Sequence, residues 1–69
     1  MTVDMKKVRE DMDREWDMTG EEFDKFDVAQ ANDLNEGWKE IVMENVNDDS
    51  DRFFIEVNAD SEVWNFERI

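Results

Sequence analysis

The sequence contains no cysteine, no histidine and no proline among its 69 residues. Without cysteine the chain has no disulfide framework and no thiolate metal site, and without histidine it lacks the commonest zinc ligand and the commonest general base. No apolar run approaches the roughly 20 residues that a helix needs to span a bilayer. We therefore expect a cytoplasmic protein that uses no metal or cofactor and is not an enzyme.

Basic residues are scarce as well. Eight Lys and Arg face 21 Asp and Glu, which gives a formal net charge of −13. A field of this sign repels nucleic acids and anionic membranes, so neither is expected to bind directly. A basic protein surface is the natural complement, and most of the excess charge lies in residues 20–69.

Apolar residues are plentiful enough for a folded domain. The chain is 39% hydrophobic and contains three Trp and five Phe, which is unlike a disordered acidic tail. A chain of this length buries only about 60% of the surface that its unfolded form exposes. We expect one domain over residues 1–69, with one modest core.

The first segment has the spacing of an amphipathic helix. Met5, Val8, Met12 and Trp16 recur at i, i+3, i+7 and i+11, which places them on one helical face. The spacing predicts a helix over residues 4–17. Its surface charges alternate in sign at i+4 spacing, so this helix is expected to be structural.

A second helix is expected to begin at Gly20. Thr19 and Glu22 fit a capping box, and Met18 with Phe23 fits a hydrophobic staple. Asp27 offers another N-cap, so residues 20–46 are compatible with one helix or two.

From Val28 onward the apolar residues keep helical spacing. They are Ala31, Leu34, Trp38, Ile41 and Val42. The pattern predicts a helix that continues to about Val46, with Gly37 as an internal weak point costing up to about 1 kcal/mol relative to Ala.

The period then changes from 3.6 to 2. After the polar stretch 47–51, Phe53, Ile55 and Val57 alternate with polar or outward positions. A turn at 58–61 and a second strand from Val63 complete a hairpin. The expected fold class is therefore α+β, with two or three N-terminal helices followed by a C-terminal antiparallel β-hairpin packed on them.

Four carboxylates would share one face of the predicted third helix. Asp33, Glu36, Glu40 and Glu44 are spaced by three, four and four residues. On a helix this row would be about 16 Å long, since each residue rises about 1.5 Å. It predicts a partner-binding stripe that imitates the charges of a nucleic-acid backbone; the alternatives are a solvated helix face and adaptation to high salt.

Phe54 is the odd apolar residue of the predicted hairpin. It follows Phe53 directly and so points to the opposite side of the strand. It is either part of a second small cluster, with Val63 or a helix, or an exposed aromatic anchor inside a charged rim.

These observations favour a stoichiometric inhibitor that presents nucleic-acid-like charge to the basic groove of a DNA- or RNA-binding protein. In size and charge alone, the chain is similar to the nucleic-acid mimics that phages and mobile elements direct against restriction enzymes, CRISPR effectors or DNA-repair enzymes. The alternative is an acidic regulatory module, such as an antitoxin or adaptor, that binds through an aromatic hairpin surface. The two would differ in salt dependence, because a charge-mimic complex weakens steeply with ionic strength.

Overall fold

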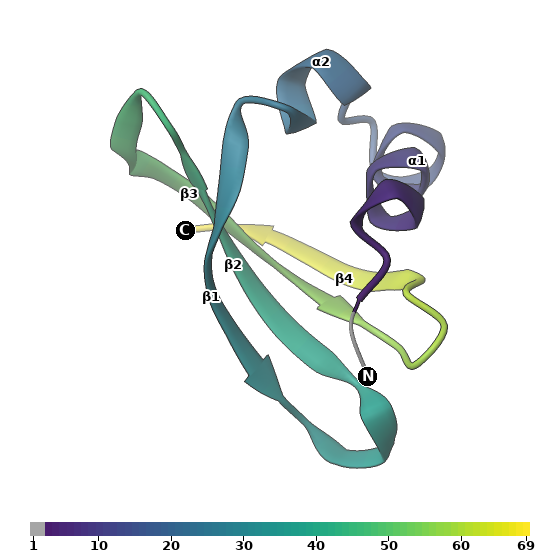
Figure 1. The fold of residues 1–69 in the computed structure, drawn as a ribbon. Coiled ribbons are helices and arrows are strands. Elements are labelled where there is room, and N and C mark those ends of the chain that lie inside the picture. The colour runs from purple at the N-terminus through teal and green to yellow at the C-terminus, as the bar shows by residue number, and fades with distance from the viewer. Residues whose placement is uncertain (1–2) are drawn as a thin grey trace.

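The computed structural model describes residues 3–69, in which two short helices precede a four-stranded sheet (Figure 1). The strands pair in the order β1-β2-β3-β4, each antiparallel to the next one along the chain. The elements are α1 (Met5–Glu15), α2 (Gly20–Phe23), β1 (Phe26–Asp33), the 3-10 turn η1 (Asn35–Gly37), β2 (Lys39–Asn45), β3 (Asp48–Val57) and β4 (Val63–Arg68).

The first predicted helix, over residues 4–17, is observed as the shorter α1 (Met5–Glu15), and the predicted start of the second helix at Gly20 is confirmed. Asp4 caps α1 by accepting hydrogen bonds from the backbone N–H groups of Lys6 and Lys7. Thr19 accepts from the backbone N–H of Glu22, so α2 begins at Gly20 as the capping box predicts. α2 is only one turn long, however, and the chain turns into β1 after it.

The predicted helix over residues 28–46 is wrong, and with it the expected fold class. This segment is the β1–β2 hairpin, so the protein is mostly β. Asn35–Gly37 forms its turn, with Glu36 at φ 62° and Gly37 at φ 82°. The Leu34 N–H donates to the Trp38 carbonyl across the turn at 2.8 Å. Backbone of this hand interrupts a helix and is tolerated best by glycine.

Long-range pairing explains why the segment is extended. β2 lies between β1 and β3, so both of its edges form ladder hydrogen bonds. Ile41 and Met43 are buried in the core, whereas Leu34, which the helical pattern placed on the buried face, is exposed. The second hairpin turns at 46–47, and Asp48–Asp51, expected as a loop, begin β3.

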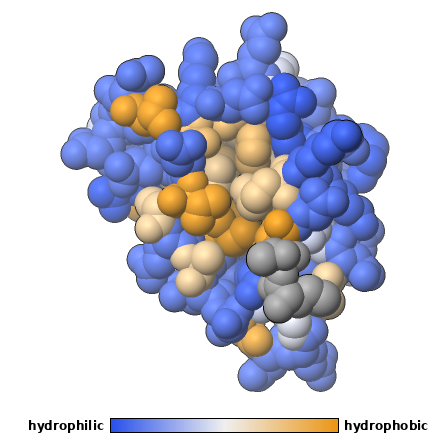
Figure 2. All heavy atoms as spheres, viewed as in Figure 1, coloured by the Kyte–Doolittle hydropathy of each residue, from blue (hydrophilic) through white to orange (hydrophobic). Residues whose placement is uncertain are grey.

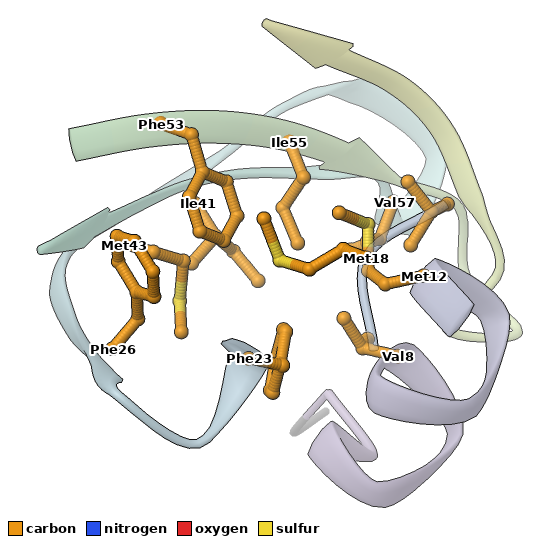
Figure 3. Close-up of a cluster of buried hydrophobic side chains, with 11 residues drawn as sticks. Val8, Met12, Met18, Phe23, Phe26, Ile41, Met43, Phe53, Ile55 and Val57 are labelled. Atoms are coloured by element: carbon orange, nitrogen blue, oxygen red, sulfur yellow. The ribbon is translucent and has the colours of Figure 1, made fainter. Parts of the chain in front are cut away.

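The core lies between the helices and one face of the sheet (Figure 3). At its centre the Phe53 ring has edge-on contacts with Phe26 and Phe66, at centroid distances of 4.8 and 5.2 Å. Such contacts add about 0.5–1.5 kcal/mol beyond the buried area. The buried hydrophobic residues are Val8, Met12, Met18, Phe23, Phe26, Ile41, Met43, Phe53, Ile55, Val57 and Val63.

A buried carboxylate joins α1 to the edge of the sheet. Asp11 is 5% exposed, and its Oδ2 accepts the backbone N–H of Val63 at 2.7 Å, while its Oδ1 pairs with Arg14. The Val63 N–H belongs to an edge strand, so without Asp11 it would have no partner in the sheet. α1 therefore does more than cover the core, because it also caps β4.

No helix within residues 3–69 has the length and hydrophobicity required to cross a membrane.

Candidate functional site: the acidic face of the sheet

The face of the sheet turned away from the helices carries charge instead of core residues. Residues opposite each other in an antiparallel pair project from the same side, and neighbours along a strand project from opposite sides. No described helix covers this side, since α1 and α2 both pack on the other one (Figure 3). We call it the acidic sheet face; the register assigns to it Asp27, Gln30, Asn32, Glu40, Val42, Glu44, Arg52, Phe54, Glu56, Asn65 and Glu67.

An apolar pair occupies the middle of this face. Val42 on β2 lies directly opposite Phe54 on β3, and both side chains are half-buried. Gln30 on β1 flanks the pair on one side and Glu67 on β4 flanks it on the other. Phe54 is thus neither in the core nor against a helix, and it is an aromatic side chain within a polar rim.

Carboxylates surround the apolar pair. Glu40 on β2 lies opposite Glu56 on β3, a like-charge pair that disfavours the sheet. Glu44 is paired with Arg52, whose Nη2 is 3.3 Å from the Glu44 Oε2. Arg52 is the single cation assigned to the acidic sheet face among residues 3–69, against five carboxylates.

The carboxylates are spread over two dimensions. Glu40 and Glu44 are four residues apart on β2, which corresponds to about 13 Å along the strand. Neighbouring strands add charges at about 4.8 Å spacing across the sheet. For comparison, one strand of duplex DNA carries a charge per about 3.4 Å of helix axis. The face is therefore a patch of negative charge with an apolar centre rather than a single row.

The structure brings together three of the five residues predicted to bind a partner. Glu40, Glu44 and Phe54 lie on the acidic sheet face. Asp33 lies at the far end of β1, where it pairs with Lys39, and Glu36 lies in the turn between β1 and β2. The four carboxylates do not form a row on one helix, because no helix exists there.

The hydrogen bond and charge of Lys39 lower the pKa of Asp33. This carboxylate is therefore held by a neighbour within its own hairpin, at a place separate from the acidic sheet face. It offers less uncompensated charge to a partner than the sequence pattern suggested.

Sequence reasoning missed the cross-strand neighbours that complete the face. Val42, Glu56 and Glu67 were not singled out, because their position depends on strand register. A local signal was present, since Ile41 and Met43 alternate with Glu40, Val42 and Glu44 in the same two-residue period as the strand over 53–57. The helical spacing of the larger apolar residues obscured it.

Within the described part of the chain, no group of three or more Asp or Glu side chains is arranged to hold a metal ion. Comparisons of the chain with models of known protein families, with characterised proteins and with solved structures gave no match.

Proposed function

We propose that this protein is a stoichiometric inhibitor that binds the basic groove of a DNA- or RNA-binding protein through the acidic sheet face. The observation that carries the proposal is the composition of that face, in which five carboxylates and one Arg surround the Val42–Phe54 pair. Bound in a basic groove, such a face would exclude the nucleic acid that normally occupies it. The site of action we propose is the cytoplasm.

The net charge supports this proposal. A small domain needs a net charge of only about 2 to 8 in magnitude to remain soluble, and −13 exceeds that range. Excess charge costs stability through self-repulsion, and Glu40 opposite Glu56 is a place in the sheet where we expect that cost. A basic partner would relieve that repulsion, and the same field would speed its association.

The apolar centre of the acidic sheet face is expected to supply binding affinity. Charge steers association and sets orientation, whereas affinity comes mostly from a few well-packed aromatic or apolar contacts enclosed by a polar rim. Val42 and Phe54 have this position within the acidic sheet face. We expect them to distinguish one basic groove from another.

A second candidate function rests on the tryptophans. Trp38 and Trp64 are paired with ring centroids 5.7 Å apart, and Trp64 is 62% exposed. An exposed aromatic pair suits an adaptor or antitoxin whose affinity is mainly apolar. Binding to such a partner should change little between low and high salt, whereas a groove-blocking complex should weaken steeply.

The test begins with partner capture from the native host and then measures displacement. The captured protein is loaded with labelled nucleic acid, and the acidic protein is titrated against it. We expect release of the nucleic acid at one-to-one stoichiometry and no direct binding of the acidic protein to the nucleic acid. A captured partner without a nucleic-acid site, or one that binds both ligands together, would refute the proposal.

Matched variants locate the surface responsible. Neutralising four carboxylates of the acidic sheet face should weaken the complex by at least about 2 kcal/mol, or roughly thirtyfold. Neutralising four exposed carboxylates elsewhere should cost much less. Equal losses of binding in the two variants would indicate that overall charge attracts the partner. The assignment of binding to the acidic sheet face would then be wrong. The first variant replaces Glu40, Glu44, Glu56 and Glu67 by Gln; the second replaces Glu10 and Glu21 by Gln and Asp13 and Asp49 by Asn.

A further inference from the structure

A separate pocket lies beside the start of β4, where the end of α1 approaches the edge of the sheet. Its volume is about 480 Å³, and it is open to solvent. Two tryptophans and three carboxylates line it together with one arginine, and none of these residues belongs to the acidic sheet face. They are Trp16, Trp64, Asp11, Glu15, Glu62 and Arg14.

The carboxylates of this pocket differ in how many hydrogen bonds and ion pairs they already form. Asp11 is buried and is held by the Val63 N–H and by Arg14. Glu15 has only a 3.3 Å contact with the Arg14 Nε, and both side chains are largely exposed. Glu62 accepts a hydrogen bond from the Asn58 side-chain amide. Because Arg14 is the one cation lining the pocket, two of the three negative charges remain uncompensated.

Each tryptophan of the pocket contacts another aromatic ring. Trp64 rests against Trp38 at 5.7 Å, yet 62% of Trp64 remains exposed. Trp16 packs edge-on against Phe66 at 6.1 Å. The Trp16 Nε1 is a buried donor without a hydrogen-bond partner.

We propose that this pocket binds an arginine side chain of the partner protein. A guanidinium is planar, so it stacks on an exposed indole face, and it donates to carboxylates through several N–H groups. Trp64 supplies the face, and Glu15 and Glu62 supply the acceptors. A lysine would keep the charge but lose the stacking.

This inference deepens the proposed function, because the arginine would come from the same basic partner. It adds a second point of attachment, at the β4 edge, that fixes how the acidic sheet face is oriented in the groove. The partner need not be known to test it, since a short peptide can replace it.

The experiment titrates ¹⁵N-labelled protein with the peptide acetyl-Gly-Arg-Gly-amide and follows amide and indole N–H signals by NMR. We expect saturable shifts centred on the Trp64 indole and the Val63 amide, with a dissociation constant on the order of millimolar. The same peptide with citrulline, the neutral analogue of arginine, should bind at least about threefold more weakly. Equal binding of the two peptides would overturn the proposal.

Variants assign the binding to the pocket. Trp64→Ala should weaken it at least about threefold, whereas Val46→Ala, an exposed apolar side chain in the turn between β2 and β3, should not change it. Should Trp64→Ala fail to fold, the pair Glu15→Gln with Glu62→Gln serves instead, matched against Glu40→Gln with Glu44→Gln. If only Glu40→Gln with Glu44→Gln weakens peptide binding, the arginine binds at the acidic sheet face. The pocket proposal would then be refuted, and the proposed function would not. The same pocket variants are also measured in the nucleic-acid displacement assay. This tests the opposite outcome, in which the pocket binds arginine but the acidic sheet face does not block the groove.

Discussion

The two faces of the sheet differ more than any other two regions of this protein. On β3, Phe53 is 0% exposed and lies among other aromatic rings, whereas the next residue, Phe54, lies on the acidic sheet face opposite Val42. Glu40 and Ile41 on β2 are separated in the same way. Stability and surface charge are therefore carried by alternate residues of the same strands, so one can be changed without the other.

One side of the molecule leaves apolar residues uncovered. Seen from the side shown in Figure 2, hydrophilic side chains surround an apolar patch near the centre of the molecule. The helices cover only part of the inner face, and Val28 on β1 remains 48% exposed. A small core combined with a large charge leaves little stability in reserve, so changes on the inner face should have the larger effects.

The largest expected effect comes from truncating the inner of the two adjacent phenylalanines. Phe53→Ala should cost about 3–5 kcal/mol, because it leaves a cavity and removes two ring contacts. That loss is comparable with the whole stability of a domain of this size, so the variant should be largely unfolded. Phe54→Ala, at a half-buried position, should cost about 1 kcal/mol and remain folded. Urea denaturation followed by tryptophan fluorescence measures both.

The partner assay then completes the comparison. Phe54→Ala should bind the partner more weakly although it folds, because Phe54 is at the centre of the proposed contact. If Phe54→Ala unfolds as readily as Phe53→Ala, the outer face must be covered in solution, and its assignment as a free surface is wrong.

The elements whose signals are local could be predicted from the sequence. α1 and the start of α2 depend on caps and on i, i+3 and i+4 contacts, and the β3–β4 hairpin depends on simple alternation. β1 and β2 could not, because their apolar residues also fit a helical spacing. What decides their structure is pairing with β3, such as Met43 opposite Phe53, ten residues further along the chain.

The same reason limits the prediction of the candidate site. Net charge and the choice of Glu40, Glu44 and Phe54 follow from residue types and local spacing. Their grouping with Val42, Glu56 and Glu67 follows only from strand register, since a shift by one residue would exchange the two faces.

The buried carboxylate gives the next effect in size. Asp11→Ala should cost about 1–3 kcal/mol, because it leaves the buried Val63 N–H without an acceptor. Asp11→Asn keeps an acceptor at that position and should cost less. The amide of Val63 should also exchange its hydrogen faster in Asp11→Ala, which hydrogen-exchange NMR measures. Equal stability of Asp11→Ala and the parent would mean that α1 does not cap the β4 edge.

Acidification tests aspartates that lie outside the acidic sheet face. A hydrogen bond and charge from Arg9 lower the pKa of Asp24, Lys39 lowers the pKa of Asp33, and hydrogen bonds from Ser50 lower the pKa of Asp48. Their folded pKa values lie below the unfolded value of about 3.9, so their contribution is complete above about pH 4 and is lost as the pH falls through the folded values.

The melting temperature should therefore fall below about pH 4 and show no earlier loss. Replacing Asp24, Asp33 and Asp48 together by Asn should reduce this acid-dependent loss. A melting temperature that falls steadily from pH 7, or an unchanged acid loss in the triple variant, would show that other carboxylates control acid stability.

The smallest expected effect distinguishes the two faces most directly, because here a loss of charge should stabilise the fold. Glu56→Gln removes the like-charge pair with Glu40 and retains a side-chain oxygen for the Asn65 amide, which now donates to the Glu56 Oε1 at 3.2 Å. Relief of one cross-strand repulsion should raise the free energy of unfolding by about 0.2–0.5 kcal/mol, or the melting temperature by about 1–4 °C.

Asp13→Asn on α1 is the matched control, since it removes one exposed charge that faces no carboxylate across a strand. The Glu56→Gln gain should shrink at about 0.5 M salt, where screening weakens the pair, and should be smaller in a Glu40→Gln background because the repulsion is already gone. An equal gain from Asp13→Asn would attribute the effect to total charge, and a loss of stability in Glu56→Gln would show that this carboxylate stabilises the sheet rather than serving a partner.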